Sequence, residues 1–164
     1  MTNVKDNFFV LTGGPGGGKS TLLKEMHTMG FEFIDETARQ IIKERIFRGM
    51  PPRPSPLEFA VQMFEKDLQN FTSNSIKTNV IFFDRSFLDS AALIYEADVS
   101  YFKRIEKIIT THRFNTKVFI TPPWKEIYQT DNERDQSYQE SVSVYEKLFD
   151  WYSLCGYQLK PLPK

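Results

Sequence analysis

The sequence of 164 residues contains 21 basic and 21 acidic side chains, so its formal net charge at pH 7 is zero. This balance argues against nucleic acid or an anionic membrane surface as a partner, and the single cysteine, Cys155, excludes an intrachain disulfide framework and a cysteine-based zinc site. Hydrophobic residues make up 40% of the chain, which favours one folded domain over residues 1–164. The apolar run at residues 8–11 is too short to span a bilayer, so we expect a cytoplasmic protein; its oligomeric state is not predicted.

Short apolar segments alternate with amphipathic segments along the chain. We predict strands at residues 8–11, 31–35, 79–84, 117–121 and 157–163. Between them we predict helices at residues 20–29, 37–48, 57–77, 88–96 and 101–112, and two further helical stretches before Gly156. Residues 49–56 hold four of the nine prolines and must form a loop. The alternation predicts an α/β fold in which a parallel sheet carries helices on both faces.

The segment GGPGGGKS at residues 13–20 lies between the first predicted strand and the first predicted helix. It matches the pattern G-x-x-x-x-G-K-[ST] of a phosphate-binding loop, and the alternative is a flexible glycine turn. Glycines let the backbone approach a phosphate closely, so that its N–H groups and the helix N-terminus form an anion cradle. Lys19 would contact the β- and γ-phosphates of ATP, and Ser20 would offer its hydroxyl to Mg²⁺. The predicted nucleotide-binding residues are Gly13, Gly14, Pro15, Gly16, Gly17, Gly18, Lys19, Ser20 and Thr21.

Asp84 and Arg85 follow the strand predicted at residues 79–84. Because the carboxyl ends of parallel strands meet at one edge of a sheet, Asp84 should lie beside the glycine loop. Its carboxylate would hold the magnesium shell or take a proton from the attacking hydroxyl; the alternative is an aspartate that ends a strand or caps a helix. Arg85 would bind an anionic or hydroxylated substrate, or else form a surface salt bridge.

Glu36 and Arg39 follow the second predicted strand and lie three residues apart at the start of a helix, so they can share a face. We predict that they clamp the substrate, with Glu36 as a candidate general base. The alternative is that the helix N-terminus alone favours an acidic residue there. Gln62, on the helix predicted at residues 57–77, is a candidate to face a substrate base.

The polar segment at residues 128–138 follows the fourth predicted strand. Arg134 lies within it among acidic residues. We predict that this arginine belongs to a lid at residues 124–138, which closes over the triphosphate and stabilises the charge of the transition state. The alternative is an ordinary solvated connection.

Five segments together resemble the P-loop kinase branch, and within it the AAA-type ATPase family that is similar to nicotinamide riboside kinases. They are GGPGGGKST from residue 13, ETAR at 36–39, FFDRS at 82–86, PPWKEIYQTDNER at 122–134 and the ending GYQLKPLPK. The resemblance implies a P-loop NTPase three-layer sandwich with a five-stranded parallel sheet in the order 2-3-1-4-5 and a helical lid. It also implies that Lys19, Ser20 and Asp84 hold ATP and Mg²⁺ and that Arg134 belongs to the lid. These folds commonly carry a helix after the last strand, which the sequence ending at Lys164 lacks, so we expect an incomplete purine pocket.

Two functions of different classes follow from these features. Because relatives in the resembled family phosphorylate nucleoside-like or nucleotide substrates, the first is a small-molecule kinase that moves the γ-phosphoryl group of ATP to a hydroxyl. The second is a nucleotide-hydrolysing switch or regulatory binder, with ATP or GTP controlling a partner. Glu36, Arg39, Arg85 and the predicted lid favour the kinase. The sequence lacks the N-K-x-D segment that reads guanine, which argues against an ordinary GTPase switch.

Overall fold

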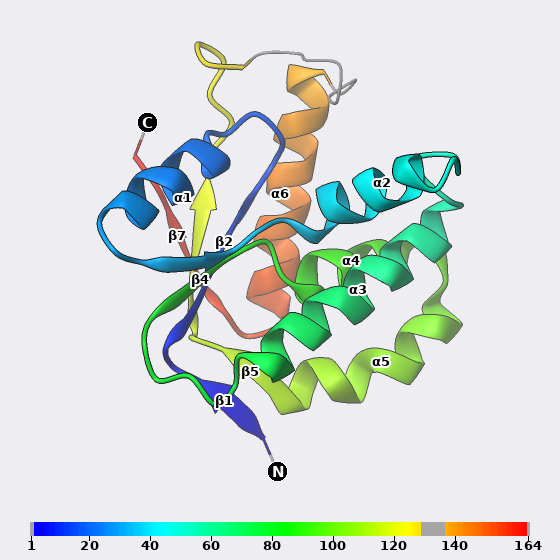
Figure 1. Ribbon diagram of the computed structural model, residues 1–164, viewed down its shortest axis with the longest axis horizontal. Helices are drawn as coiled ribbons and strands as arrows, with labels where there is room; N and C mark the ends of the chain where they lie inside the picture. Colours follow the sequence, from blue (N-terminus) through cyan, green and yellow to red (C-terminus); the bar gives the residue numbers. More distant parts are fainter. Residues whose placement is uncertain (1, 129–136, 164) are drawn as a thin grey trace.

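The computed structural model describes residues 2–128 and 137–163 (Figure 1). Within these residues, the central sheet has five parallel strands in the order β3-β4-β2-β6-β7. The strands are β2 at Phe8–Gly13, β3 at Glu32–Ile34, β4 at Ile81–Asp84, β6 at Lys117–Thr121 and β7 at Gln158–Pro161. Counted along the chain within this sheet, the order is 2-3-1-4-5, which confirms the predicted α/β class and strand order.

The helices of the described residues agree with the predicted ones to within a few residues. They are α1 at Lys19–Thr28, α2 at Thr37–Phe47, α3 at Pro56–Ser73, α4 at Phe87–Ala97, α5 at Val99–Thr111 and α6 at Tyr138–Leu154. None of those in the described ranges is long and apolar enough to cross a bilayer. The prediction placed the end of α3 at residue 77, which is wrong: the Asn74 side chain donates to the Asn70 carbonyl at 2.8 Å and ends the helix earlier.

The helical lid predicted from the sequence falls in the region between β6 and α6. Residues 125–127 form a turn, and Tyr138 is already the first residue of α6. Residues 129–136, which include Arg134, lie outside the described part of the chain. Of the two helical stretches predicted before Gly156, α6 is therefore confirmed, and the lid at 124–138 stays a prediction.

A small second sheet was not predicted. It pairs β1 at Asn3–Lys5 with β5 at His112–Phe114 in parallel. The helix predicted to include His112 was wrong at that residue, since α5 ends at Thr111. Each strand has three residues, which is too short for a periodic pattern to reveal it.

Helices cover both faces of the central sheet, as the three-layer prediction requires. On one face, His27 of α1 lies against Phe33 of β3, with ring centroids 5.7 Å apart. On the other face, Phe71 of α3 packs edge-on against Phe8 of β2 at 5.3 Å and Phe114 of β5 at 4.9 Å. Figure 1 shows α3, α4 and α5 gathered on one side of the sheet and α1 on the other. Fully buried phenylalanines therefore fix the sheet against α3 and α4.

The turn from β4 to α4 contains an unusual backbone conformation. Asp84 ends β4 and Ser86 caps α4, which leaves Arg85 to change the direction of the chain. Arg85 has a φ of 66°, and its N–H donates to the Leu11 carbonyl of β2 at 2.9 Å. A left-handed conformation is unfavourable for a residue with a Cβ atom, so the surrounding contacts must hold it.

We predict that Arg85→Gly is more stable to unfolding than Arg85→Ala by about 1 kcal/mol. Both variants remove the guanidinium, so the difference isolates the cost of the positive φ, which glycine avoids. Equilibrium urea unfolding followed by circular dichroism measures this difference. Equal midpoints and equal slopes for the two variants would show that the conformation of Arg85 is not strained.

Candidate nucleotide-binding site

The glycine loop predicted at residues 13–20 connects the end of β2 to the start of α1. Gly13, Gly16 and Gly18 have φ angles of 138°, 75° and 82°, which side chains with a Cβ atom rarely adopt. Gly18 immediately precedes the first helical residue, Lys19, so the loop ends at the helix N-terminus. This geometry turns backbone N–H groups and the positive end of the helix dipole toward one place, as an anion site requires.

Residues at the end of β6 and in α6 pack closely around the loop and explain glycines that φ alone does not. A Cβ atom on Gly14 would lie 2.5 Å from the Ser141 carbonyl oxygen, and one on Gly17 would lie 2.6 Å from Thr121 Oγ1. The Ser141 hydroxyl of α6 also donates to the Pro15 carbonyl at 2.8 Å. The first turn of α6 and the end of β6 therefore hold the loop from outside.

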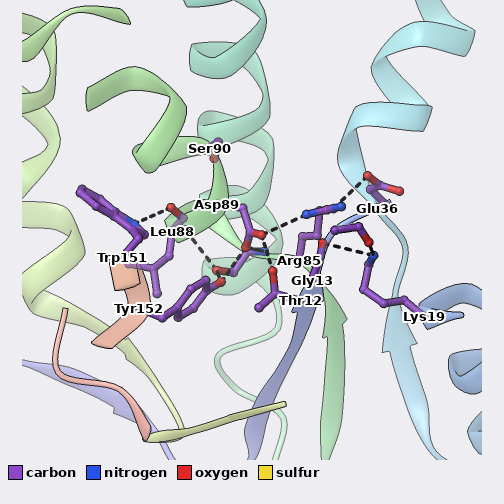
Figure 2. A network of polar contacts seen from close by, with 12 residues as sticks. Thr12, Gly13, Lys19, Glu36, Arg85, Leu88, Asp89, Ser90, Trp151 and Tyr152 are labelled. Carbon is purple, nitrogen blue, oxygen red and sulfur yellow. Dashed lines mark hydrogen bonds and ion pairs between the residues drawn. The ribbon is translucent and has the colours of Figure 1, made fainter. Parts of the chain in front are cut away.

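Lys19 is buried, and its ammonium group contacts its own loop. Its Nζ donates to the Gly14 carbonyl at 2.9 Å and to the Gly13 carbonyl at 3.4 Å (Figure 2). Burial lowers the pKa of Lys19 and the Arg85 charge lowers it further, while the Asp84 and Glu36 carboxylates oppose the shift. The lysine is thus a desolvated cation at the place where phosphates would enter.

Asp84 lies at the carboxyl end of β4, as the sequence predicted, and its side chain is buried. Its Oδ1 has no hydrogen-bond partner among the residues that the structure describes. Burial raises the pKa of Asp84 above its ordinary value, although the nearby Lys19 charge opposes the change. A buried carboxylate oxygen without a partner is energetically unfavourable, and a bound cation would satisfy it.

Glu36 and Arg85 form an ion pair, and this pair is not the surface salt bridge considered as an alternative for Arg85. The Glu36 carboxylate accepts from Arg85 Nε at 3.2 Å and pairs with Arg39 Nε at 3.3 Å (Figure 2 shows the first). The Glu36 and Arg85 side chains are about four-fifths buried, whereas that of Arg39 is 41% exposed. Burial would raise the pKa of Glu36, but the charges of Arg85, Lys19 and Arg39 hold it below its ordinary value.

Asp89, which sequence reasoning did not select, contacts this cluster from α4. Its Oδ1 accepts from Arg85 Nη1 at 3.3 Å and from the Thr12 hydroxyl at 2.5 Å (Figure 2). The available sequence signal was Ser86-x-x-Asp89, the pattern of a capping box, which both residues form at the start of α4. That pattern predicts a helix start and does not predict the contact with Arg85.

The remaining predicted residues differ in exposure. Ser20 is half-buried in the first turn of α1, and Thr21 beside it is exposed. Gln62 is half-buried on α3 and donates to Glu58 of the same helix at 3.2 Å, so its contact with a substrate base stays a prediction. Arg134 belongs to the residues outside the described ranges.

The residues present fit a magnesium ion that binds together with a nucleotide. Within residues 2–128 and 137–163, no three His, Cys, Asp or Glu side chains gather into a metal site of their own. Mg²⁺ bound with a nucleotide needs only one or two protein ligands, because phosphate and water oxygens complete its shell. The Ser20 hydroxyl and the Asp84 carboxylate, with its unpaired Oδ1, are oxygen donors of the required kind.

Solved structures share this fold at low sequence identity. A deoxyadenosine kinase from M. mycoides, with the products dCMP and a flexible dCDP bound, is 13% identical with a TM-score of 0.68, over 95% of this chain and 90% of its own. The same enzyme with bound dATP is 15% identical with a TM-score of 0.59, over 95% of this chain and 90% of its own. The NadR protein in complex with NR is 16% identical with a TM-score of 0.70, over 96% of this chain but 45% of NadR.

Among protein families, the model described as an AAA domain matches residues 8–164. No curated protein sequence matches the chain. The family match begins at the first residue of β2 and includes the loop, Asp84 and all five strands of the central sheet. It confirms the family resemblance inferred from the sequence. The chain therefore belongs to the AAA domain family, with the fold of P-loop kinases.

Proposed function

We propose that this protein is a kinase that transfers the γ-phosphoryl group of Mg-ATP to a hydroxyl of a small nucleoside-like or nucleotide-like substrate. One observation carries the proposal: the Glu36–Arg85 ion pair, about four-fifths buried, lies beside the glycine loop, because the Arg85 N–H donates to the carbonyl of Leu11 in the strand that leads into the loop. A nucleotide site needs the loop, Lys19 and Asp84. The adjacent pair supplies a separate place to bind and orient an acceptor.

The loop half of the site would bind the triphosphate. Its N–H groups and the α1 N-terminus favour the phosphate oxygens, and Lys19 would leave the Gly13 and Gly14 carbonyls to pair with the β- and γ-phosphates. Ser20 and Asp84 would hold the Mg²⁺. A bound ion would supply positive charge against the negative charge that develops on the phosphoryl group.

The other half would orient the acceptor. Arg85 is a buried fork of N–H donors suited to a phosphate, carboxylate or hydroxyl oxygen, and Glu36 can accept a hydrogen bond from the attacking hydroxyl. The lowered pKa of Glu36 makes it a weak base. Orientation is nevertheless the main requirement, because phosphoryl transfer passes through a loose transition state in which positioning and electrostatics dominate. Arg39 and Gln62 would line the outer wall of this half, and Arg134 would act from the lid.

The similar structures support the acceptor class. One is named as a deoxyadenosine kinase and was solved with nucleotide products, and the other holds NR. Their identities to this chain are 13% and 16%, so they support a nucleoside-like acceptor by shared fold and do not identify it.

Membership of the AAA domain family favours a second candidate, a nucleotide-hydrolysing switch or regulatory protein. That function would use the loop, Lys19 and Asp84 in the same way but would leave the Glu36–Arg85 pair without an acceptor. The two candidates therefore differ in whether ADP release depends on a small molecule.

The test is a screen of ADP release from Mg-ATP with nucleosides, nucleotides and vitamin-derived ribosides as acceptors, against the background with water alone. The kinase proposal predicts that at least one compound raises ADP release and appears as a phosphorylated product by mass spectrometry. Steady hydrolysis that no compound in the panel accelerates, with free phosphate as the sole product, would favour the second candidate.

We predict that Lys19→Ala abolishes measurable binding of Mg-ATP in isothermal titration calorimetry, and lowers turnover by about a hundredfold or more. The variant loses the cation that would neutralise the phosphates in a buried place. Lys24→Ala is the matched control, because Lys24 lies on the same helix and is exposed. Unchanged affinity and turnover in Lys19→Ala would remove the loop from the proposed site.

Asp84→Asn should bind Mg-ATP within about threefold of the wild-type affinity and lose about a hundredfold in turnover. The amide keeps the size of the side chain but lacks the charge that would hold the magnesium shell or accept a proton. Asp35→Asn, at an exposed position after β3, serves as the control. If Asp84→Asn turned over at the wild-type rate in saturating magnesium, Asp84 would have only a structural role.

A further inference from the structure

The Asp89 side chain is buried and accepts four hydrogen bonds, two on each carboxylate oxygen. Oδ2 accepts from the Ser86 N–H at 3.0 Å and from the Tyr152 hydroxyl of α6 at 2.6 Å. Oδ1 accepts from the Thr12 hydroxyl at 2.5 Å and from Arg85 Nη1 at 3.3 Å. The two oxygens therefore serve different neighbours.

The contacts of Oδ2 explain the structural role of Asp89. The bond from the Ser86 N–H completes the capping box of α4, and the bond from Tyr152 joins α4 to α6. A capping box needs one acceptor oxygen at this position. The capping box therefore does not need the two contacts of Oδ1, and both are made with residues beside the candidate site.

Oδ1 connects the two strand ends on which the proposed site depends. Thr12 is the residue before Gly13, where the glycine loop begins, and Arg85 is the residue after Asp84. Arg85 has its other carboxylate contact with Glu36, so its guanidinium is held between the N-cap residue of α2 and an acid of α4. The backbone of Arg85 has a positive φ, which the surrounding contacts must hold.

We propose that Asp89 is a positioning residue for phosphoryl transfer. Its Oδ1 fixes the Arg85 guanidinium beside Glu36 and ties that arrangement to the start of the glycine loop through Thr12 (Figure 2). The inference rests on the proposed kinase function, since it assigns Asp89 to the acceptor half of that site. Asp89 itself would touch neither substrate.

Asp89→Asn tests the proposal because an asparagine cannot reproduce both oxygens. If its carbonyl oxygen keeps the Ser86 and Tyr152 contacts, its NH₂ group faces Arg85, which has no acceptor atom. We expect the acceptor-dependent kcat to fall by about 10- to 100-fold, as for a misplaced orienting group, with the Kd of Mg-ATP changed less than about threefold. The loop should keep its nucleotide affinity because Thr121 and Ser141 still hold it.

Tyr152→Phe is the matched control. It removes one donor from Oδ2 and leaves both Oδ1 contacts in place. It should lower the melting temperature but keep kcat within about threefold of wild type. A wild-type kcat in Asp89→Asn, or an equal loss of kcat in Tyr152→Phe, would overturn the positioning role.

A double-mutant cycle shows whether Asp89 acts through Arg85. In an Arg85→Ala background, Asp89→Asn should change kcat no further, because the group that it positions is absent. A further loss of the same size as in the single variant would contradict the proposal.

Should Asp89→Asn fail to fold, Thr12→Val replaces it. This variant removes one donor to Oδ1, and kcat should fall while the affinity for Mg-ATP is kept. Unchanged kcat in Thr12→Val would then count against the proposal.

A readout without an acceptor separates this inference from the kinase proposal. If the wild-type protein phosphorylates no compound in the screen, the kinase proposal fails, and amide hydrogen exchange at Arg85 still reports its positioning. The Arg85 N–H bonds to the Leu11 carbonyl, and its exchange should become about tenfold faster in Asp89→Asn but not in Tyr152→Phe. Equal exchange in all three proteins would overturn the positioning of Arg85 by Asp89.

Discussion

Parallel pairing of β2 with β4, in the register that sets Leu11 beside Asp84, determines where the glycine loop, Asp84 and Arg85 lie relative to one another. The pairing ends both strands at one edge of the sheet, so that the loop after β2 and the carboxylate at the end of β4 meet there. The Arg85 N–H extends the pairing by one more bond to Leu11, and the turn that follows directs the guanidinium toward Glu36. The aromatic core beneath, in which Phe8 of β2 packs on Phe83 of β4 with centroids 5.0 Å apart, keeps this register rigid.

Two kinds of charged group share this edge, and burial affects them differently. Arg85 has carboxylate partners in Glu36 and Asp89, so its charge is compensated within the fold. Lys19 contacts only carbonyl oxygens among the described hydrogen bonds, and Asp84 keeps an unpaired oxygen within the described part of the chain. Burial lowers the pKa of Lys19 and raises the pKa of Asp84, and both shifts favour the neutral form of the side chain. A triphosphate with its magnesium ion would supply the charge that each of them lacks. Lys19 and Asp84 therefore differ from Arg85, whose charge is already paired within the fold.

The parts of this site that could be predicted from the sequence are those fixed by local pattern. Glycine spacing identified the loop, and a strand end identified Asp84, because both depend on residues close together in the chain. Asp89 could not be found in this way, since its partners Thr12 and Tyr152 lie 77 and 63 residues away. The positive φ of Arg85 has no sequence signal either, because the fold imposes it on a residue that does not favour it. The strands β1 and β5 are too short for a sequence pattern to predict them. The role predicted for Arg134 concerns a residue outside the described ranges.

We propose that the loop at residues 13–20 and Asp84 form one magnesium–nucleotide site. A crystal structure with a non-hydrolysable ATP analogue and Mn²⁺ in place of Mg²⁺, with the metal located by anomalous scattering, tests it most directly. We expect a triphosphate in the loop, Lys19 moved from the Gly13 and Gly14 carbonyls to the phosphates, and a metal held between the Ser20 hydroxyl and the Asp84 carboxylate, directly or through water. A nucleotide bound elsewhere, or a metal remote from Asp84 while Lys19 keeps its carbonyl contacts, would contradict it.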